Sequence, residues 1–157
     1  MENKLIRGLI LGLFVFASNL SAAGGEAGTV LSAHGTVIAK VSGQRKLLNQ
    51  GDDIFVNDRI VTGDKSFVVL KFEDGASVTL LQDSTVFIES YRYNASEQDA
   101  ATLRLESGGL RFLAGAMAKS NPAGYKVRTP VALMVIRGPE FAVTLCGTQI
   151  CTGEEEN

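Results

Sequence analysis

Turn signals recur at short intervals along the chain, and they limit the length of any regular element between them. Gly, Asp and Asn favour tight turns, so the elements between such residues must be short. Those elements alternate apolar and polar residues, which is the two-residue period of a half-buried strand, and helical periodicity is hard to find. The pattern predicts an all-β fold. Four of the signals stand within residues 51–75: Gly51-Asp52, Asn57-Asp58, Gly63-Asp64 and Asp74-Gly75.

Two hairpins are expected in the middle of the chain. In Ser66–Gln82, Asp74-Gly75 suits a two-residue type I′ turn, which needs positive φ at both residues. In Ala101–Leu113, Ser107-Gly108-Gly109 supplies the turn. Ten or so short strands predict a single antiparallel domain; a sandwich and a solenoid-like stack of hairpins both fit the spacing. Alternation in the second hairpin places Leu103, Leu105, Leu110 and Phe112 inward, and Arg104, Glu106 and Arg111 outward.

The N-terminal residues have the organisation of a secretory signal peptide. The apolar run Gly8–Ala17 is shorter than the roughly 20 residues that span a bilayer. Ser21 and Ala23 occupy the small-residue positions of a signal-peptidase site. We therefore predict cleavage after Ala23, localisation in the periplasm or outside the cell, and no membrane span in the mature chain; an uncleaved anchor is the alternative. The expected divisions are a signal peptide (1–23), a linker (24–34), a β domain (35–147) and a C-terminal tail (148–157).

Charge and cysteine content bear on the partners. The formal net charge of −2 is near neutral and offers no electrostatic reason to expect a nucleic acid or an anionic membrane. Cys146 and Cys151 flank Gly147-Thr148, which could form a tight turn. Paired cysteines of exported proteins are usually disulfides, so we predict a Cys146–Cys151 bond, with free thiols as the alternative. No other Cys or His stands nearby to complete a zinc site.

Catalytic chemistry has little support in the sequence. Hydrolytic triads need a general base, usually His, and His34 is the single histidine. Most Asp residues stand in turns, where Asp bonds to nearby backbone amides. No Gly-rich phosphate loop follows a strand and opens a helix. We expect no catalytic residues, no metal site and no cofactor.

The segment Arg128–Phe141 contains an apolar run without alternation, Val131–Ile136. Such a run predicts a strand that is covered on both faces. Pro130 is tolerated at the start of a strand, and Gly138-Pro139 forces a turn, so Phe141 begins the return strand of a closing hairpin.

Basic residues divide into two groups. Arg137 follows the apolar run, so we expect it to be partly buried and, because a buried guanidinium must be paired, to pair with Glu140. The segment Ala114–Gly124 is irregular and is the best candidate for an exposed, mobile loop. The remaining basic residues alternate outward and either share one face or are simply solvated: Arg92, Arg104, Arg111, Lys126 and Arg128.

Several motifs, taken in order, resemble those of the FecR domain family. The first are Gly51-Asp52, Thr62-Gly63, Asp74-Gly75 and the run Ser84–Ile88; "LRLESGGLRF" is similar to a family hairpin element. "VRTPVALMVIRGPEFAV" resembles the family's closing signature, with Pro139 where the family usually has Thr. The resemblance covers about residues 35–145. The residues that carry its structural signature are Asp74, Gly75, Thr129, Pro130, Arg137, Gly138 and Phe141.

The resemblance implies an all-β periplasmic domain without catalysis. Regulators of this family relay a signal from an outer-membrane receptor to a sigma factor through a cytoplasmic anti-sigma region. Seven residues precede the apolar run here, so we expect no anti-sigma region. The leading interpretation is an exported FecR-like module that binds an unidentified envelope protein. The alternatives are a signalling component that acts on a sigma factor through a partner chain, and a structural envelope protein that self-associates through sheet edges.

Overall fold

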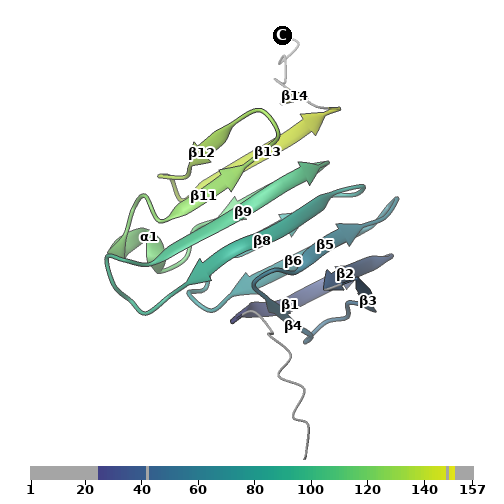
Figure 1. Cartoon of the computed structure of the whole chain (residues 1–157), viewed down its shortest axis with the longest axis horizontal. Helices are drawn as coiled ribbons and strands as arrows, with labels where there is room; N and C mark the ends of the chain where they lie inside the picture. The colour runs from purple at the N-terminus through teal and green to yellow at the C-terminus, as the bar shows by residue number, and fades with distance from the viewer. Residues whose placement is uncertain (1–24, 42, 148, 151–157) are drawn as a thin grey trace, which may run out of the picture.

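Two seven-stranded sheets form the part of the chain that the computed structural model describes, residues 25–41, 43–147 and 149–150 (Figure 1). We call them sheet A and sheet B and give the strands of each from one edge to the other. Sheet A consists of β14 (Gln149–Ile150), β13 (Glu140–Cys146), β10 (Gly109–Leu113), β7 (Ser77–Leu80), β6 (Phe67–Phe72), β1 (Glu26–His34) and β4 (Asp53–Phe55). Sheet B consists of β12 (Leu133–Val135), β11 (Tyr125–Arg128), β9 (Ala100–Ser107), β8 (Thr85–Arg92), β5 (Arg59–Thr62), β2 (Val37–Val41) and β3 (Gln44–Leu47).

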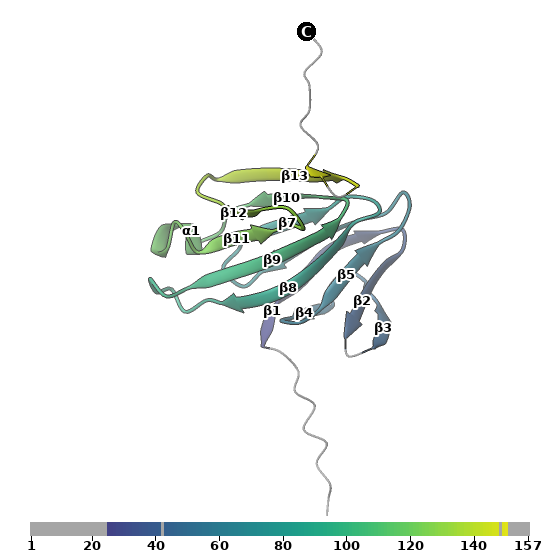
Figure 2. The same ribbon diagram turned by 45° about the horizontal axis from the view of Figure 1, so that its top comes forward.

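The two sheets lie one behind the other and enclose the core (Figures 1 and 2). The prediction of an all-β fold is confirmed. Of the two architectures that fit the spacing, a sandwich and a solenoid-like stack, the two-layered arrangement is that of a sandwich. The chain nevertheless changes sheet after every one or two strands, so each layer is assembled from segments distant in sequence. Pairing is antiparallel except between β9 and β11. No helix in the described ranges combines the length and apolarity needed to cross a bilayer.

The core follows the two-residue alternation of the strands. Val68, Leu70 and Phe72 of β6 are buried, and the intervening side chains are not. The inward positions predicted for β9 and β10 are confirmed, because Leu103, Leu105, Leu110 and Phe112 are all at most 3% exposed. Alternation decides these positions locally, since successive side chains of a strand point to opposite faces.

The β6–β7 hairpin forms as predicted, but its turn is different. Phe72 N–H donates to the carbonyl of Ala76 (2.9 Å), and Gly75 N–H donates to that of Phe72 (2.9 Å). Gly75 has φ of 83°, whereas Asp74 is not among the residues with positive φ. The connection is therefore a three-residue loop whose last residue is left-handed, and the type I′ prediction is wrong. The Asp74 carboxylate stabilises this loop, since it accepts a hydrogen bond from Ala76 N–H (3.2 Å).

The expected hairpin over residues 101–113 is instead a corner between the sheets. β9 belongs to sheet B and pairs with β8 and β11, while β10 belongs to sheet A and pairs with β7 and β13. Gly108 sits at the corner with φ of 74°. A Cβ there would lie 2.6 Å from the Ser84 Cα and 2.8 Å from the Asp83 carbonyl oxygen. The close approach of these two chain segments requires glycine.

Two further predictions on chain organisation are wrong. Most of the expected linker forms strand β1, which pairs with β4 and β6 and contributes Val30 to the core. The expected exposed loop Ala114–Gly124 contains the short helix α1 (Met117–Ser120), and Met117 is fully buried. Both segments are held by contacts with strands remote in sequence, which a local reading could not anticipate.

Candidate binding surface

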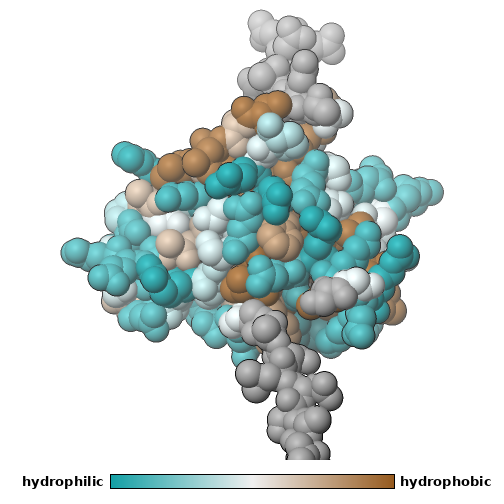
Figure 3. Space-filling view, viewed as in Figure 1, coloured by the Kyte–Doolittle hydropathy of each residue, from teal (hydrophilic) through white to brown (hydrophobic). Residues whose placement is uncertain are grey.

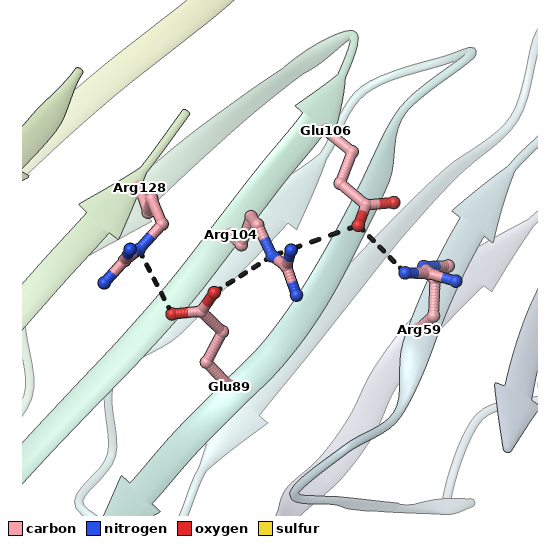
Figure 4. A network of polar contacts seen from close by, with 5 residues as sticks. All are labelled: Arg59, Glu89, Arg104, Glu106 and Arg128. Carbon is pink, nitrogen blue, oxygen red and sulfur yellow. Dashed lines mark hydrogen bonds and ion pairs between the residues drawn. The ribbon is translucent and has the colours of Figure 1, made fainter. Parts of the chain in front are cut away.

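The outer face of sheet B carries a line of alternating charges (Figure 4). We call it the charge ladder; it consists of Arg128, Glu89, Arg104, Glu106 and Arg59. Its members come from four strands: Arg59 lies on β5, Glu89 on β8, Arg104 and Glu106 on β9, and Arg128 on β11. Arg104 and Glu106 are two residues apart and therefore on the same face of β9. The shared face follows from strand alternation, because each ladder residue is next to a strand residue buried in the core: Ile60, Ile88, Leu103, Leu105 and Val127.

The ladder spans four adjacent strands through ion pairs. Arg59 Nη2 donates to Glu106 Oε1 at 3.0 Å. Arg104 Nε lies 2.9 Å from Glu89 Oε1 and 3.9 Å from Glu106 Oε1. Arg128 Nε lies 3.3 Å from Glu89 Oε2. Three guanidinium groups thus share two carboxylates, which leaves one positive charge in excess.

A bulge in β8 and an aromatic ring organise the ladder. The β8–β9 register shifts between Ile88 and Ser90, so Glu89 occupies the extra position of a bulge, which re-aims a side chain. The Phe87 ring lies beneath two guanidinium groups, with Arg104 Cζ at 4.9 Å and Arg59 Cζ at 5.5 Å from its centroid. These are cation–π distances, so the ring stabilises two of the ladder's three cations.

The edge of sheet B next to the ladder is apolar. We call its residues the edge row: Val131, Leu133 and Val135. Their exposed fractions are 58%, 57% and 43%. Leu133 lies opposite Arg128 and Val135 lies opposite Lys126 in the β11–β12 register, so the row continues the outer face to the last strand. In Figure 3 hydrophobic colours gather at the rim where β12 lies, above a largely hydrophilic face.

The edge row corrects the prediction of a strand buried on both faces. Only three residues of the apolar run form a strand, and that strand is the edge of its sheet. Exposure alternates along the segment, with Ile136 buried and its two neighbours exposed. Sequence could not distinguish this arrangement, because both faces are apolar whether the outer one is covered or not.

Arg137 is also placed differently from the prediction. It is exposed and makes no ion pair in the described part of the chain, while Glu140 pairs with Arg111 across the β10–β13 register. The expected closing hairpin does not form either, because β12 pairs with β11 and β13 with β10. Arg137 stands in the connection between two sheets, where the chain turns outward, and it is not a buried anchor.

The predicted set of outward basic residues is divided between the two sheets. Arg104, Lys126 and Arg128 share the outer face of sheet B. Arg111 lies on sheet A, where it pairs with Glu140. The cations therefore concentrate on one face beside the edge row.

Asp74 of the predicted signature is a buried structural hub rather than a surface residue. Its carboxylate accepts hydrogen bonds from the backbone N–H groups of Ala76 and Met117, each at 3.2 Å. It also accepts from the hydroxyls of Tyr91, at 3.1 Å, and of Tyr125. Burial raises the pKa of both tyrosines well above the usual range, and the Asp74 charge raises it further. The hub joins the β6–β7 turn to α1, β8 and β11.

The other signature residues shape the connections on either side of β12. Thr129 is buried; its N–H donates to the Ala132 carbonyl (2.8 Å), and its hydroxyl accepts from Ala132 N–H (3.0 Å). These bonds close a two-residue loop in which Pro130 needs no donor. Phe141 packs partly buried against the core. A Cβ at Gly138 would make only an ordinary contact, 3.5 Å from the Glu140 carbonyl oxygen, and Gly138 has no left-handed φ, so nothing in the structure explains why glycine stands there.

The predicted disulfide includes Cys151, which lies outside the described residues, so it stays a prediction. The other cysteine, Cys146, is described and ends β13 opposite Gln149 of β14. The predicted signal peptide and its cleavage after Ala23 also lie outside the described residues. Within the described ranges, no group of three His, Cys, Asp or Glu side chains is placed to hold a metal ion.

The comparisons with known proteins identify the family. A family model described as "FecR protein" matches residues 58–152, which is 95 of the 157 residues. The chain belongs to the FecR protein family. The match includes the whole charge ladder and the whole edge row, so the candidate surface is part of the FecR domain.

Two other comparisons add little. No curated protein is significantly similar to the chain. A solved structure described as a "Cell surface anchoring domain" is 32% identical over 40% of this chain and 83% of that one, with a TM-score of 0.38.

Proposed function

We propose that this FecR-family chain is a non-catalytic protein-interaction module of the cell envelope. In this proposal it binds a partner protein through the outer face of sheet B, at the edge row and the adjoining charge ladder. The family membership supports an envelope role. The described residues offer an extended surface for this role, and they hold no group of side chains placed for metal binding.

The observation that carries the proposal is the exposed edge row beside a cation-rich face. Three large apolar side chains in a row, between about two-fifths and three-fifths exposed, are a feature of interaction sites rather than of scattered surface residues. Arginine and aromatic side chains are enriched in protein interfaces, and the neighbouring ladder supplies both through Arg104, Arg128 and Phe87.

Export belongs to the same proposal. The N-terminal segment would be cleaved after Ala23, and the module would work in the periplasm or outside the cell with a Cys146–Cys151 disulfide. The intact mass of protein purified from the native compartment tests both features at once. A chain that begins at Met1, or one in which both cysteines are alkylated without reduction, would contradict the corresponding feature.

The binding proposal is tested by site-specific photo-crosslinking in intact envelopes. A photoreactive amino acid replaces Leu133, and a matched variant carries it at Lys71, which is exposed on β6 of the other sheet. We expect a discrete crosslinked partner from position 133 and none from position 71. The same products from both positions, or none from either, would refute the proposed binding surface.

A further inference from the structure

We propose that β12 binds an extended segment of another protein by strand addition, and that this segment alternates apolar and acidic residues. The proposal rests on the function proposed above and deepens it, because it names the conformation and chemistry of the partner. Strand addition uses backbone hydrogen bonds for affinity and alternate side chains for specificity. Each of these two requirements can be examined on β12.

The backbone of β12 has donors and acceptors that point away from the sheet. Thr129 N–H bonds to the Ala132 carbonyl, and Ile136 N–H bonds to the Tyr125 carbonyl at 3.0 Å. Hydrogen-bonded pairs alternate along an antiparallel ladder, so residues 132, 134 and 136 face β11. The N–H and C=O groups of Leu133 and Val135 therefore point to the open edge. Within the described part of the chain, neither amide bonds to another element.

The two edges of sheet B differ in how they are protected. Natural sheets blunt exposed edges with charged side chains, lysine above all. The edge strand β3 follows that rule, with Arg45 and Lys46 exposed within its four residues. β12 carries no charged residue and presents Leu133 and Val135 instead. An edge without charged residues, opposite an edge that carries them, indicates a docking strand.

Charge determines what kind of strand fits. Three cations flank the edge row: Lys126 opposite Val135, Arg128 opposite Leu133, and Arg137 two residues beyond Val135. Of these three cations, only Arg128 has an ion pair in the described structure, with its Nε 3.3 Å from Glu89 Oε2. The chain as a whole is negative, with a formal charge of −2, so this edge has the opposite sign. An incoming strand with acidic side chains near Lys126 and Arg137 complements it.

The same charges disfavour a second copy of this chain as the occupant. Pairing of β12 with β12 would bring the flanking cations of both copies together. A three-residue strand would also contribute far less than the roughly 800 Å² per partner of a stable interface. A segment of another protein that brings its own acidic residues avoids this repulsion, and it is not required to form a symmetric interface through β12 alone.

The probe for the test is a synthetic, end-capped heptapeptide of alternating valine and glutamate with a fluorescent label. Its binding to the purified exported chain is measured by anisotropy. Two control peptides separate the contribution of backbone hydrogen bonds from that of side-chain charge. In the first, alternate backbone nitrogens are methylated, which removes donors from one edge; in the second, lysine replaces glutamate. We expect saturable binding of the valine–glutamate peptide and binding at least about tenfold weaker for both controls.

Paired variants locate the site. Leu133→Glu places a charge in the edge row, and Leu47→Glu does the same on β3, where the exposed fraction of 58% matches the 57% of Leu133. We expect about tenfold weaker binding for Leu133→Glu and unchanged binding for Leu47→Glu. Val135→Pro removes one open-edge N–H at a position where proline is tolerated in edge strands, and it weakens binding as well. Thermal melts confirm that each variant is folded.

The outcomes separate this proposal from the proposed function. Equal binding of the N-methylated peptide, or equal loss in Leu47→Glu, overturns strand addition at β12. Equal binding of the lysine peptide overturns an acidic partner. Self-association in sedimentation that Leu133→Glu abolishes identifies a second copy and overturns the proposed occupant. A crosslinked partner at position 133 together with no peptide binding leaves the interaction function standing and refutes strand addition alone.

Discussion

Replacement of Asp74 by alanine tests the buried hub, because the residue is only 5% exposed and its carboxylate is the common acceptor for four donors. The substitution leaves two backbone N–H groups, those of Ala76 and Met117, and two hydroxyls, those of Tyr91 and Tyr125, without this acceptor. A buried donor that loses its partner costs about 1–3 kcal/mol. Water that enters the vacated space offsets part of the loss, so the lower figure applies to each donor.

The free energy of unfolding is therefore expected to fall by about 4 kcal/mol in Asp74→Ala, the sum over four donors at about 1 kcal/mol each. That is a large part of the roughly 5–15 kcal/mol that stabilises a domain. Asp74→Asn keeps one acceptor oxygen but adds two donors that need partners, and we expect a loss of about 2 kcal/mol.

The assay is equilibrium unfolding in urea, followed by far-ultraviolet and near-ultraviolet circular dichroism to check two-state behaviour. With a slope of about 2 kcal/mol/M, the Asp74→Ala midpoint falls by about 2 M. The matched control is Asp64→Ala, an exposed turn aspartate whose carboxylate makes no hydrogen bond in the described structure; its expected change is within about 0.5 kcal/mol. A loss below about 1 kcal/mol in Asp74→Ala, or one equal to the control, would refute the hub.

Four further predictions concern pH, a corner and an exposed cation. Burial and the Asp74 charge raise the pKa of Tyr91 and Tyr125, so their contribution to stability is present below the unfolded pKa of about 10 and is lost as pH rises above it; we expect their tyrosinate absorbance to appear only as the fold is lost. Burial also raises the pKa of Asp99, but hydrogen bonds from Ser96 and Asn94 outweigh it and lower the pKa overall; its contribution is present above the unfolded pKa of about 3.9 and lost below it, so Asp99→Asn melts at a lower temperature at neutral pH and differs less from the parent in acid. Gly108→Ala destabilises the chain by about 2–4 kcal/mol in urea unfolding, because left-handed backbone strain adds to the close contact at the corner. Arg137→Ala leaves the melting temperature within about 1 °C of the parent, because the side chain is exposed and makes no ion pair in the described structure.

Each of these predictions has an outcome that contradicts it. Titration of all tyrosines near pH 10 with the fold intact would refute shielding by the hub. A constant difference in melting temperature between Asp99→Asn and the parent at every pH would refute the pH-dependent contribution of Asp99 to stability. Gly51→Ala controls for backbone strain, since its φ is 88° and its surroundings are open; it should cost only about 1–2 kcal/mol. A melting temperature several degrees lower for Arg137→Ala would restore it as an anchor.

The strands and their buried faces could be predicted because the signal is local. Val68, Leu70 and Phe72 alternate with more exposed residues, and the alternation alone assigns them to the core. The position of the β6–β7 turn was predictable for the same reason, since Asp and Gly favour turns. The type of that turn was not, because it depends on acceptors and donors that α1 and two tyrosines bring to Asp74.

The candidate surface was only partly predictable. Arg104 and Glu106 were expected to point outward, and they do, but alternation does not say which other strands lie alongside β9. Glu89 pairs with two arginines on neighbouring strands, and it occupies the unpaired position of a bulge that no residue type in the sequence announces. The edge row was missed because the run Val131–Ile136 is apolar at every position, so the sequence contains no contrast between a covered face and an open one.

By itself, then, the sequence determined an all-β chain, the inward face of most strands and the family signature, because each depends on residues within a few positions of one another. Only the tertiary structure decided that β9 and β10 belong to different sheets, that Arg137 is exposed, and that β12 is an edge. Sheet membership and edge position depend on hydrogen bonds between segments far apart in the chain. Two strands with the same local pattern can be central or terminal, and only the completed pairing distinguishes them.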